Sequence, residues 1–301
     1  MIVLKSLIKR NVKMFFKDKG LLFTSLITPM ILLVLYATFL GNVYEDSFRQ
    51  ILKSIAPDLK VSDSLINGCV GGQLFSSLLA VCTVTVTFCS NMLMVQDKAN
   101  GTINDINITP VKGSTLALGY YLSTFITTLM ICILATVACL IYIAMIGWYF
   151  SVLDILLILL DVFLLVMFGT ALSSIINYFL SSQGQISAVG SIVSSCYGFL
   201  CGAYMPISQF SKGLQNIVAF FPGIYGTSLL RNHTLNGVFA KMENVGLPSK
   251  AINEIKNSID CNIYFFDNKV TVSTMYLCLG GITVLLVGIY ILMNLKKKKT
   301  S

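Results

Sequence analysis

Few residues of this sequence have the types and spacing that catalysis requires. The glycine-rich loop that binds nucleotide phosphates is absent, since Lys112-Gly113-Ser114-Thr115 has similar residues in another order. No zinc-protease, serine-hydrolase or paired-carboxylate motif occurs, and the single histidine, His233, has no cysteine or histidine nearby. We therefore expect this chain to have no catalytic residue, no metal site and no cofactor of its own.

One acidic residue has an unusual position. Asp161 lies well inside an apolar run, and Asp154 precedes it by seven residues on the same helical face. A carboxylate inside a membrane is costly and is by default a candidate for proton or cation transfer. The alternative, which we favour, is that this run is longer than the bilayer is thick. Asp161 would then lie near the outer membrane surface.

The composition is that of a membrane protein. The chain has 301 residues, of which 55% are hydrophobic and only 11% charged, and its mean hydropathy is +0.81. A soluble domain carries about a quarter charged residues, so both a soluble enzyme and a disordered chain are excluded. The net charge of +8 must first be placed relative to a bilayer, and we expect no nucleic-acid partner. Eight of the nine cysteines lie in apolar runs and act as small hydrophobic residues.

Hydropathy predicts an all-α polytopic membrane protein. A helix needs about 20 apolar residues to cross the hydrocarbon, and six runs meet this length: 21–43, 68–95, 115–147, 152–180, 185–204 and 273–295. An external loop at 205–270 would contain a further apolar stretch, 214–230, which Pro222 and Gly223 interrupt. We expect this stretch to form a broken, re-entrant pair of helices before the last span.

The distribution of charge predicts the orientation. With six spans and an internal N-terminus, the cytoplasmic parts hold 12 basic and three acidic residues, whereas the rest holds nine basic and ten acidic. Basic residues collect on the cytoplasmic side, so both termini should be cytoplasmic, in a multi-pass cell-membrane protein. Residues 1–19 separate apolar from basic side chains on a helical wheel, which is typical of an amphipathic helix lying in the lipid headgroups.

Two spans carry polar faces that could line a pathway. In the second span the polar face includes amides and hydroxyls that lipid cannot satisfy, namely Gln73, Ser77, Thr83, Thr87 and Asn91. This face indicates a pathway or a seam between subunits. In the fifth span small residues share one face with Ser187, Ser191 and Ser194. Small residues also permit close helix packing, and we favour packing slightly there.

The loop at 97–111 is the most informative segment. Ile103 and Ile106 would form an apolar ridge on a helix of about two turns, which Pro110 ends. A short helix of this kind between two long spans suits docking into a groove on a cytoplasmic partner. An ordinary polar turn is the alternative.

The sequence resembles the permeases of the type-2 family of ABC exporters. The loop motif is similar to that family's coupling helix, and consists of Gly101, Thr102, Ile103, Ile106, Thr109, Pro110 and Val111. A second block is similar to the family's last external region, and consists of Met205-Pro206-Ile207, Leu214-Gln215, Pro222, Tyr225 and Leu229-Leu230-Arg231. The order of these segments and the six spans agree over the whole chain.

The resemblance implies a half-transporter with one permease domain over residues 1–301. Two such subunits, identical or different, would join two cytoplasmic ATPase subunits, which would bind ATP and Mg. ATP-driven closure of the ATPases would act through the coupling helix to export a hydrophobic or amphipathic molecule, such as a drug, a peptide or a lipid-linked compound. A bacterial source is expected. The alternative functions are an ion-coupled secondary transporter that uses Asp161 and an integral-membrane lipid enzyme, although no internal repeat and no cluster of acidic residues or histidines supports either.

Overall fold

The computed structural model describes residues 2–55 and 61–297. Residue 1 of the expected interfacial segment lies outside the described residues. So do residues 56–60 of the first expected external loop and the last two lysines of the C-terminal run, Lys298 and Lys299.

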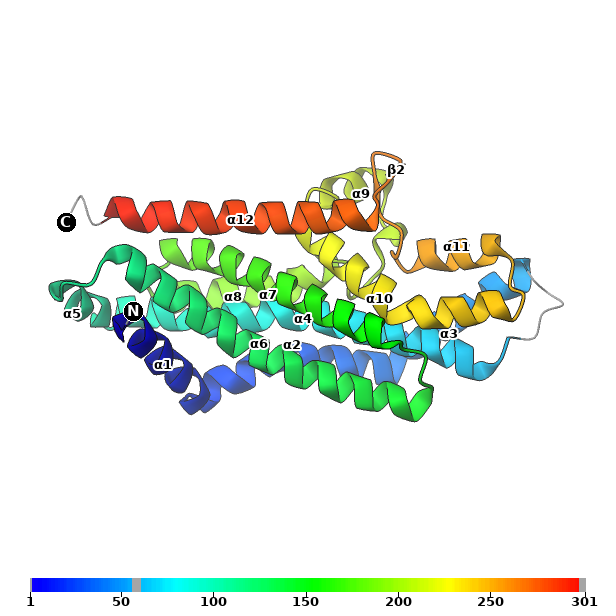
Figure 1. The fold of residues 1–301 in the computed structure, drawn as a ribbon, viewed down its shortest axis with the longest axis horizontal. Helices are drawn as coiled ribbons and strands as arrows, with labels where there is room; N and C mark the ends of the chain where they lie inside the picture. The colour runs from blue at the N-terminus through cyan, green and yellow to red at the C-terminus, as the bar shows by residue number, and fades with distance from the viewer. Residues whose placement is uncertain (1, 56–60, 298–301) are drawn as a thin grey trace.

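The chain forms an elongated bundle of helices (Figure 1). The elements in chain order are α1 (Ile2–Lys17), α2 (Lys19–Leu35), η1 (Tyr36–Leu40), α3 (Gly41–Ile55), α4 (Asp63–Ala99), α5 (Thr102–Ile108), α6 (Gly113–Ile146), α7 (Val152–Phe179), α8 (Gln183–Leu200), η2 (Ile207–Gln209), α9 (Lys212–Val218), α10 (Pro222–Asn244), α11 (Ser249–Ser258), β1 (Tyr264–Phe265), β2 (Asn268–Lys269) and α12 (Val272–Lys297). The expected all-α polytopic membrane fold is confirmed.

Five helices of the described chain are long and apolar enough to cross a membrane: Lys19–Ser54, Asp63–Ala99, Gly113–Ile146, Val152–Phe179 and Val272–Leu295. The fifth predicted span, 185–204, corresponds to the shorter α8. This helix ends at Leu200, because Gly202 adopts a left-handed φ of 73° and the amides of Ala203 and Tyr204 bond back to the carbonyl of Gly198. A total of six spans therefore stays a prediction.

The central helix of the bundle is α4. It packs against α2, α6, α7, α8 and α10, and nearly all of its residues from Leu65 to Val95 are buried. Glycines make this packing possible. A Cβ at Gly72 would lie 2.4 Å from a methyl carbon of Leu235 on α10, so these two helices approach as closely as small residues allow.

The first span is longer than the apolar run at 21–43 indicates. The helix continues through one π-helical turn, η1, into the amphipathic α3. In η1 the amide of Gly41 bonds to the carbonyl of Tyr36, five residues earlier. Most of the expected loop before the second span is therefore helical, since α3 keeps the helical pattern although it is no longer uniformly apolar.

The interrupted stretch 214–230 forms two helices, α9 and α10. Pro222 occupies the first turn of α10, where its missing N–H costs nothing, and the Tyr225 hydroxyl donates to the carbonyl of Ala219 across the break. The second helix runs on to Asn244 and packs against α4, α7 and α12. With η2, α11 and the β1–β2 hairpin it builds a folded cap, and a re-entrant path in lipid stays a prediction.

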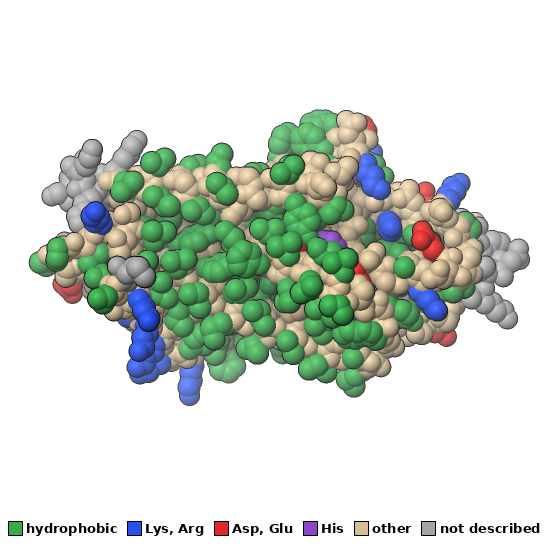
Figure 2. Space-filling view, viewed as in Figure 1, with side chains coloured by type: hydrophobic (Ala, Val, Ile, Leu, Met, Phe, Trp, Pro, Cys, Tyr) green, Lys and Arg blue, Asp and Glu red, His purple; other side chains and the backbone are tan. Residues whose placement is uncertain are grey.

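Both ends of the described chain lie at the end of the bundle that carries α5, and the cap lies at the other end with α3 (Figure 1). Hydrophobic side chains cover the middle of the face in Figure 2, whereas lysines and arginines lie toward its two ends. The position of both chain ends at the same end of the bundle is what an even number of membrane crossings requires.

We expect the α5 end to be cytoplasmic. Ser62 and Asn104 are both exposed, at opposite ends of the bundle. In a background with exposed Cys196 changed to serine, a membrane-impermeant maleimide should label Ser62→Cys in intact cells. It should label Asn104→Cys only after permeabilisation. The reverse pattern would contradict the predicted topology.

Candidate transport groove and coupling helix

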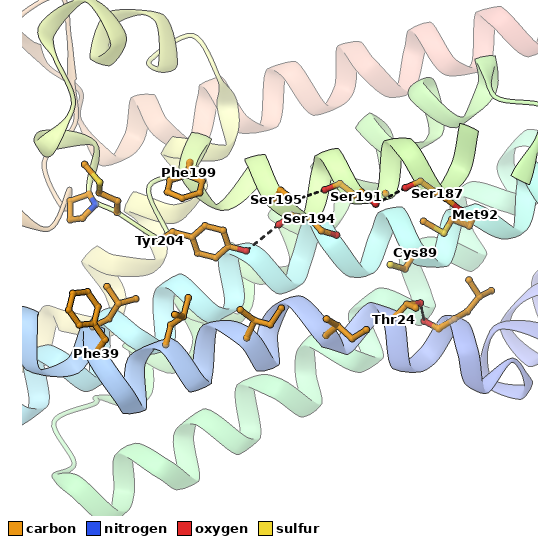
Figure 3. A pocket seen from close by; sticks show the side chains of 18 of the residues that line it. Thr24, Phe39, Cys89, Met92, Ser187, Ser191, Ser194, Ser195, Phe199 and Tyr204 are labelled. Atoms are coloured by element: carbon orange, nitrogen blue, oxygen red, sulfur yellow. Dashed lines mark hydrogen bonds between the residues drawn. The ribbon is translucent and has the colours of Figure 1, made fainter. Parts of the chain in front are cut away.

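A long groove runs along the bundle between α2 and α8 (Figure 3). Its volume is about 1390 Å³. One wall comes from α2, η1 and α3, the other from α8, and Cys89, Met92 and Gln96 of α4 form its floor. It extends from Asp18 and Gln183 near the α5 end to Pro206 and Ser258 in the cap, so it spans the hydrophobic part of the molecule.

The two walls differ in chemistry. The α2 wall presents large apolar side chains, with Ile27, Ile31 and Phe39 half or more exposed. The α8 wall presents Gly190 and a row of serines, which includes the predicted Ser187, Ser191 and Ser194 (Figure 3). Ser187 and Ser191 each donate to the carbonyl four residues earlier. Since these hydroxyls are already paired, this wall is small and smooth rather than strongly polar.

The predicted polar face of the second span lies elsewhere. All five of its residues are buried inside the subunit and none belongs to the groove lining: Gln73, Ser77, Thr83, Thr87 and Asn91. Thr83 and Thr87 lie against Gly169 of α7. The amide of Asn91 donates to Ser173 and Ser174 of the same helix at 3.1 and 3.0 Å. The part of the face with Thr83, Thr87 and Asn91 therefore joins α4 to α7, whereas Ser77 lies 3.5 Å from Arg231 of α10. A part in the pathway stays a prediction.

A buried ion pair fixes the cap to the bundle. Arg231 of α10 and Asp260 after α11 lie 3.1 Å apart, with side chains 1% and 4% exposed. Arg231 also donates to the carbonyl of Gly202, and Asp260 accepts the amides of Ile207 and Ser208 at 2.6 and 3.1 Å. Burial raises the pKa of Asp260 above its ordinary value, against the opposing effect of these partners.

Asp161 is paired rather than free. Its carboxylate is fully buried, with one oxygen 2.6 Å from Nδ1 of His233 on α10 and the other 2.6 Å from the Tyr276 hydroxyl on α12. Asp154 lies in the first turn of α7, where it caps the helix N-terminus. It also accepts a hydrogen bond from the side-chain amide of Asn236. The two acids thus bind α7 to α10 and α12. Sequence reasoning considered neither partner, since His233 is 72 positions away.

The coupling segment has the expected two-turn helix, α5, with Gly101 before it in a left-handed conformation of φ 78°. Thr102 begins the helix and Pro110 follows its end, where the Thr109 hydroxyl donates to the carbonyl of Ile106.

The faces of α5 differ from the predicted ridge. Ile103 is half-buried and packs against a cluster of the chain's own core that includes Met94 and Tyr120, and Ile106 is half-buried too. The apolar side chain that α5 exposes is Ile108, at 85%, beside Asn104 and Asp105. A docking surface on α5 would therefore centre on Ile108.

Two contacts anchor the base of this segment. Arg10 of α1 forms a two-bond ion pair with Asp97 at 2.8 and 2.9 Å, and the Tyr120 hydroxyl donates to the same carboxylate at 2.6 Å. Hydrogen bonding to Asp97 raises the pKa of Arg10. Lys98 donates to three carbonyls at the end of α7, those of Asn177, Tyr178 and Leu180. The predicted interfacial helix is therefore joined to the coupling segment.

A bundle of membrane-length helices with a lengthwise groove and a short helix at one end is the architecture expected of a membrane transport protein. The sequence model of the ABC-2 type transporter family matches residues 3–234, and a comparison with curated proteins gave no match. The chain belongs to the ABC-2 type transporter family. It is a membrane permease of an ABC transporter, which is a transport component rather than a catalytic one.

Proposed function

We propose that this chain is the permease subunit of an ATP-driven exporter in a bacterial cell membrane. It would move a hydrophobic or amphipathic molecule outward by alternating access, and a separate ATPase subunit, binding ATP and Mg, would supply the energy. The observation that carries this proposal is the groove of about 1390 Å³, which spans the bundle in a chain of the ABC-2 family. Its mostly apolar lining favours a cargo with a large apolar part.

The groove supports a second permease subunit as a partner. It has walls from α2 and α8 and a floor from α4, and it is partly open rather than enclosed. The bulky α2 wall and the smooth α8 wall are complementary in shape, since large side chains pack well against small residues. A two-fold pair could set each α2 against the partner's α8, and the two grooves would then enclose one pathway.

The coupling helix supports an ATPase partner. α5 projects at one end of the bundle (Figure 1) and exposes Ile108. A movement imposed on α5 would reach α1 through Arg10 and Asp97, and α7 through Lys98. The contacts of Asp161 leave no oxygen free of partners, so they give no support to the ion-coupled alternative.

We expect the purified chain to bind and hydrolyse no ATP by itself, because its sequence has no phosphate-binding loop. Nucleotide binding can be measured with a fluorescent ATP analogue in detergent, with and without the cognate ATPase. Turnover should appear only with the ATPase and should rise when an amphipathic substrate is added. Saturable ATP binding by the permease alone would contradict the proposal.

A further inference from the structure

A cluster of buried polar side chains lies at the cap end of the groove and has unpaired hydrogen-bonding atoms. We call it the Tyr44 cluster, and it consists of Tyr36, Tyr44, Gln73 and Arg231. The unpaired atoms are the two tyrosine hydroxyls, both amide atoms of Gln73 and Nε of Arg231. Their residues are at most 6% exposed.

The π-helical turn η1 brings the two tyrosines together. In a regular helix, residues eight apart differ by about 80° around the axis. The extra residue of the π turn removes most of this difference, and the rings of Tyr36 and Tyr44 stack with centroids 5.6 Å apart. π-helical turns occur often at functional sites, and this one aligns two hydroxyls on one face.

The cluster borders the groove through Tyr44, which belongs to the groove lining. Gln73 and Tyr36 lie beside the Tyr44 hydroxyl, and the charges of Arg231 and Asp260 act on it. Nη2 of Arg231 lies 3.5 Å from the Ser77 hydroxyl on α4. Tyr36, Gln73 and Arg231 therefore form a buried polar layer behind Tyr44 at the cap end of the groove, outside the groove lining itself.

The chemistry of these atoms favours an acceptor. An unpaired buried polar atom costs about 1–3 kcal/mol, so a cluster of five favours an added partner such as bound water or a ligand group. Nε of Arg231 and the Gln73 amide nitrogen only donate, the tyrosine hydroxyls can donate, and Gln73 Oε1 is the one atom restricted to accepting. Asp260 already balances the charge of Arg231, so the cluster would hold a headgroup through its hydrogen-bond donors rather than through a net positive charge.

We propose that the Tyr44 cluster is a headgroup subsite, which receives the oxygen-rich end of an amphipathic cargo, such as a carboxylate, while the apolar body lies in the groove. The headgroup is held directly or through bound water. This inference rests on the proposed function and adds to it a class of substrate.

The test measures binding to the permease alone, in nanodiscs and without any ATPase. The probes share one pyrene-labelled dodecyl chain and end in a carboxylate, an alcohol or a trimethylammonium group. Affinities are corrected for partition into empty nanodiscs of the same lipid. The wild type should bind the carboxylate probe at least tenfold more tightly than the ammonium probe.

The double variant Tyr44→Phe/Gln73→Met removes three of the unpaired atoms at nearly constant volume. The carboxylate preference should fall to within about twofold, since each lost hydrogen bond to a charged group is worth about tenfold. Binding of the alcohol probe should be retained. Thr128→Val is the matched control, because Thr128 also has a buried unpaired hydroxyl but lies on α6, outside the groove lining.

Three results would overturn the subsite: no headgroup preference in the wild type, an unchanged preference in the double variant, or an equal loss of all three probes. The second would show that the cluster holds only water, and the third that it serves packing. If the chain selects the carboxylate probe but no probe or partner ever stimulates ATP turnover, the proposed function fails while the subsite stands.

Discussion

Asp260→Ala should lower the stability of the folded permease by about 3–5 kcal/mol, because it leaves the guanidinium of Arg231 buried without its counter-charge. Both side chains are almost fully buried, at 1% and 4% exposed, so water cannot replace the lost carboxylate. The variant also loses the acceptor for the amides of Ile207 and Ser208. The loss can be measured as a lower melting temperature in detergent, with size-exclusion chromatography used to monitor how much folded protein remains after heating.

The cap provides its own control. Lys212 and Asp267 form an ion pair 3.4 Å apart with side chains 81% and 89% exposed, and such surface pairs contribute little. Lys212→Ala should therefore melt with the wild type. A double variant, Arg231→Met/Asp260→Leu, should recover the part of the loss that is due to the unpaired charge, but not the part due to the amides of Ile207 and Ser208, which still lack their acceptor. Equal melting of Asp260→Ala and Lys212→Ala would contradict the importance of the buried pair.

Ile108→Ser should weaken binding of the ATPase subunit by tenfold or more. Ile108 is the strongly exposed apolar side chain of α5, and burying an isoleucine in a partner's groove is worth about 1.5–3 kcal/mol, or one to two factors of ten in affinity. Since the side chain contributes little to the subunit's own core, the variant should insert and fold normally. Co-purification with the ATPase and stimulated ATP turnover would measure the effect.

Ile217→Ser is the matched control, because Ile217 is 69% exposed on α9 in the cap, at the other end of the bundle. It should leave ATPase binding unchanged. Ile103→Ala tests the orientation of α5, since Ile103 packs on the chain's own core and its loss should reduce stability as well as binding. If Ile108→Ser couples ATP turnover to transport as the wild type does, α5 does not dock through this face.

The sequence predicts the helices whose position depends on hydropathy. It does not predict which polar side chains far apart in the chain come into contact. The boundaries at 115–147 and 152–180 agree with α6 and α7 to within two residues, because long apolar runs leave the chain few other solutions. The continuation into α3 was missed, since its pattern is amphipathic.

Within the candidate site, the serines of α8 lie in the groove as their spacing allows. Sequence reasoning could not place the other polar residues. His233 and Asp161 are 72 positions apart, and Arg231 and Ser77 are 154 apart. Periodicity shows which residues share a face but not which helix that face meets. The sequence therefore allowed the polar face of α4 to be interpreted as part of a pathway, although in the structure Asn91 of this face bonds to α7.

The three hydrogen bonds from Lys98 to the last carbonyls of α7 have a mechanical consequence. They join the ends of α4 and α7 at the base of α5 and add to the packing of these two helices along their length. A force applied to α5 would therefore act on α4 and α7 as one rigid pair of helices, and the far end of this pair lies beneath the cap. A displacement of α5 at one side of the membrane would then be transmitted to the other side with little bending of the two helices.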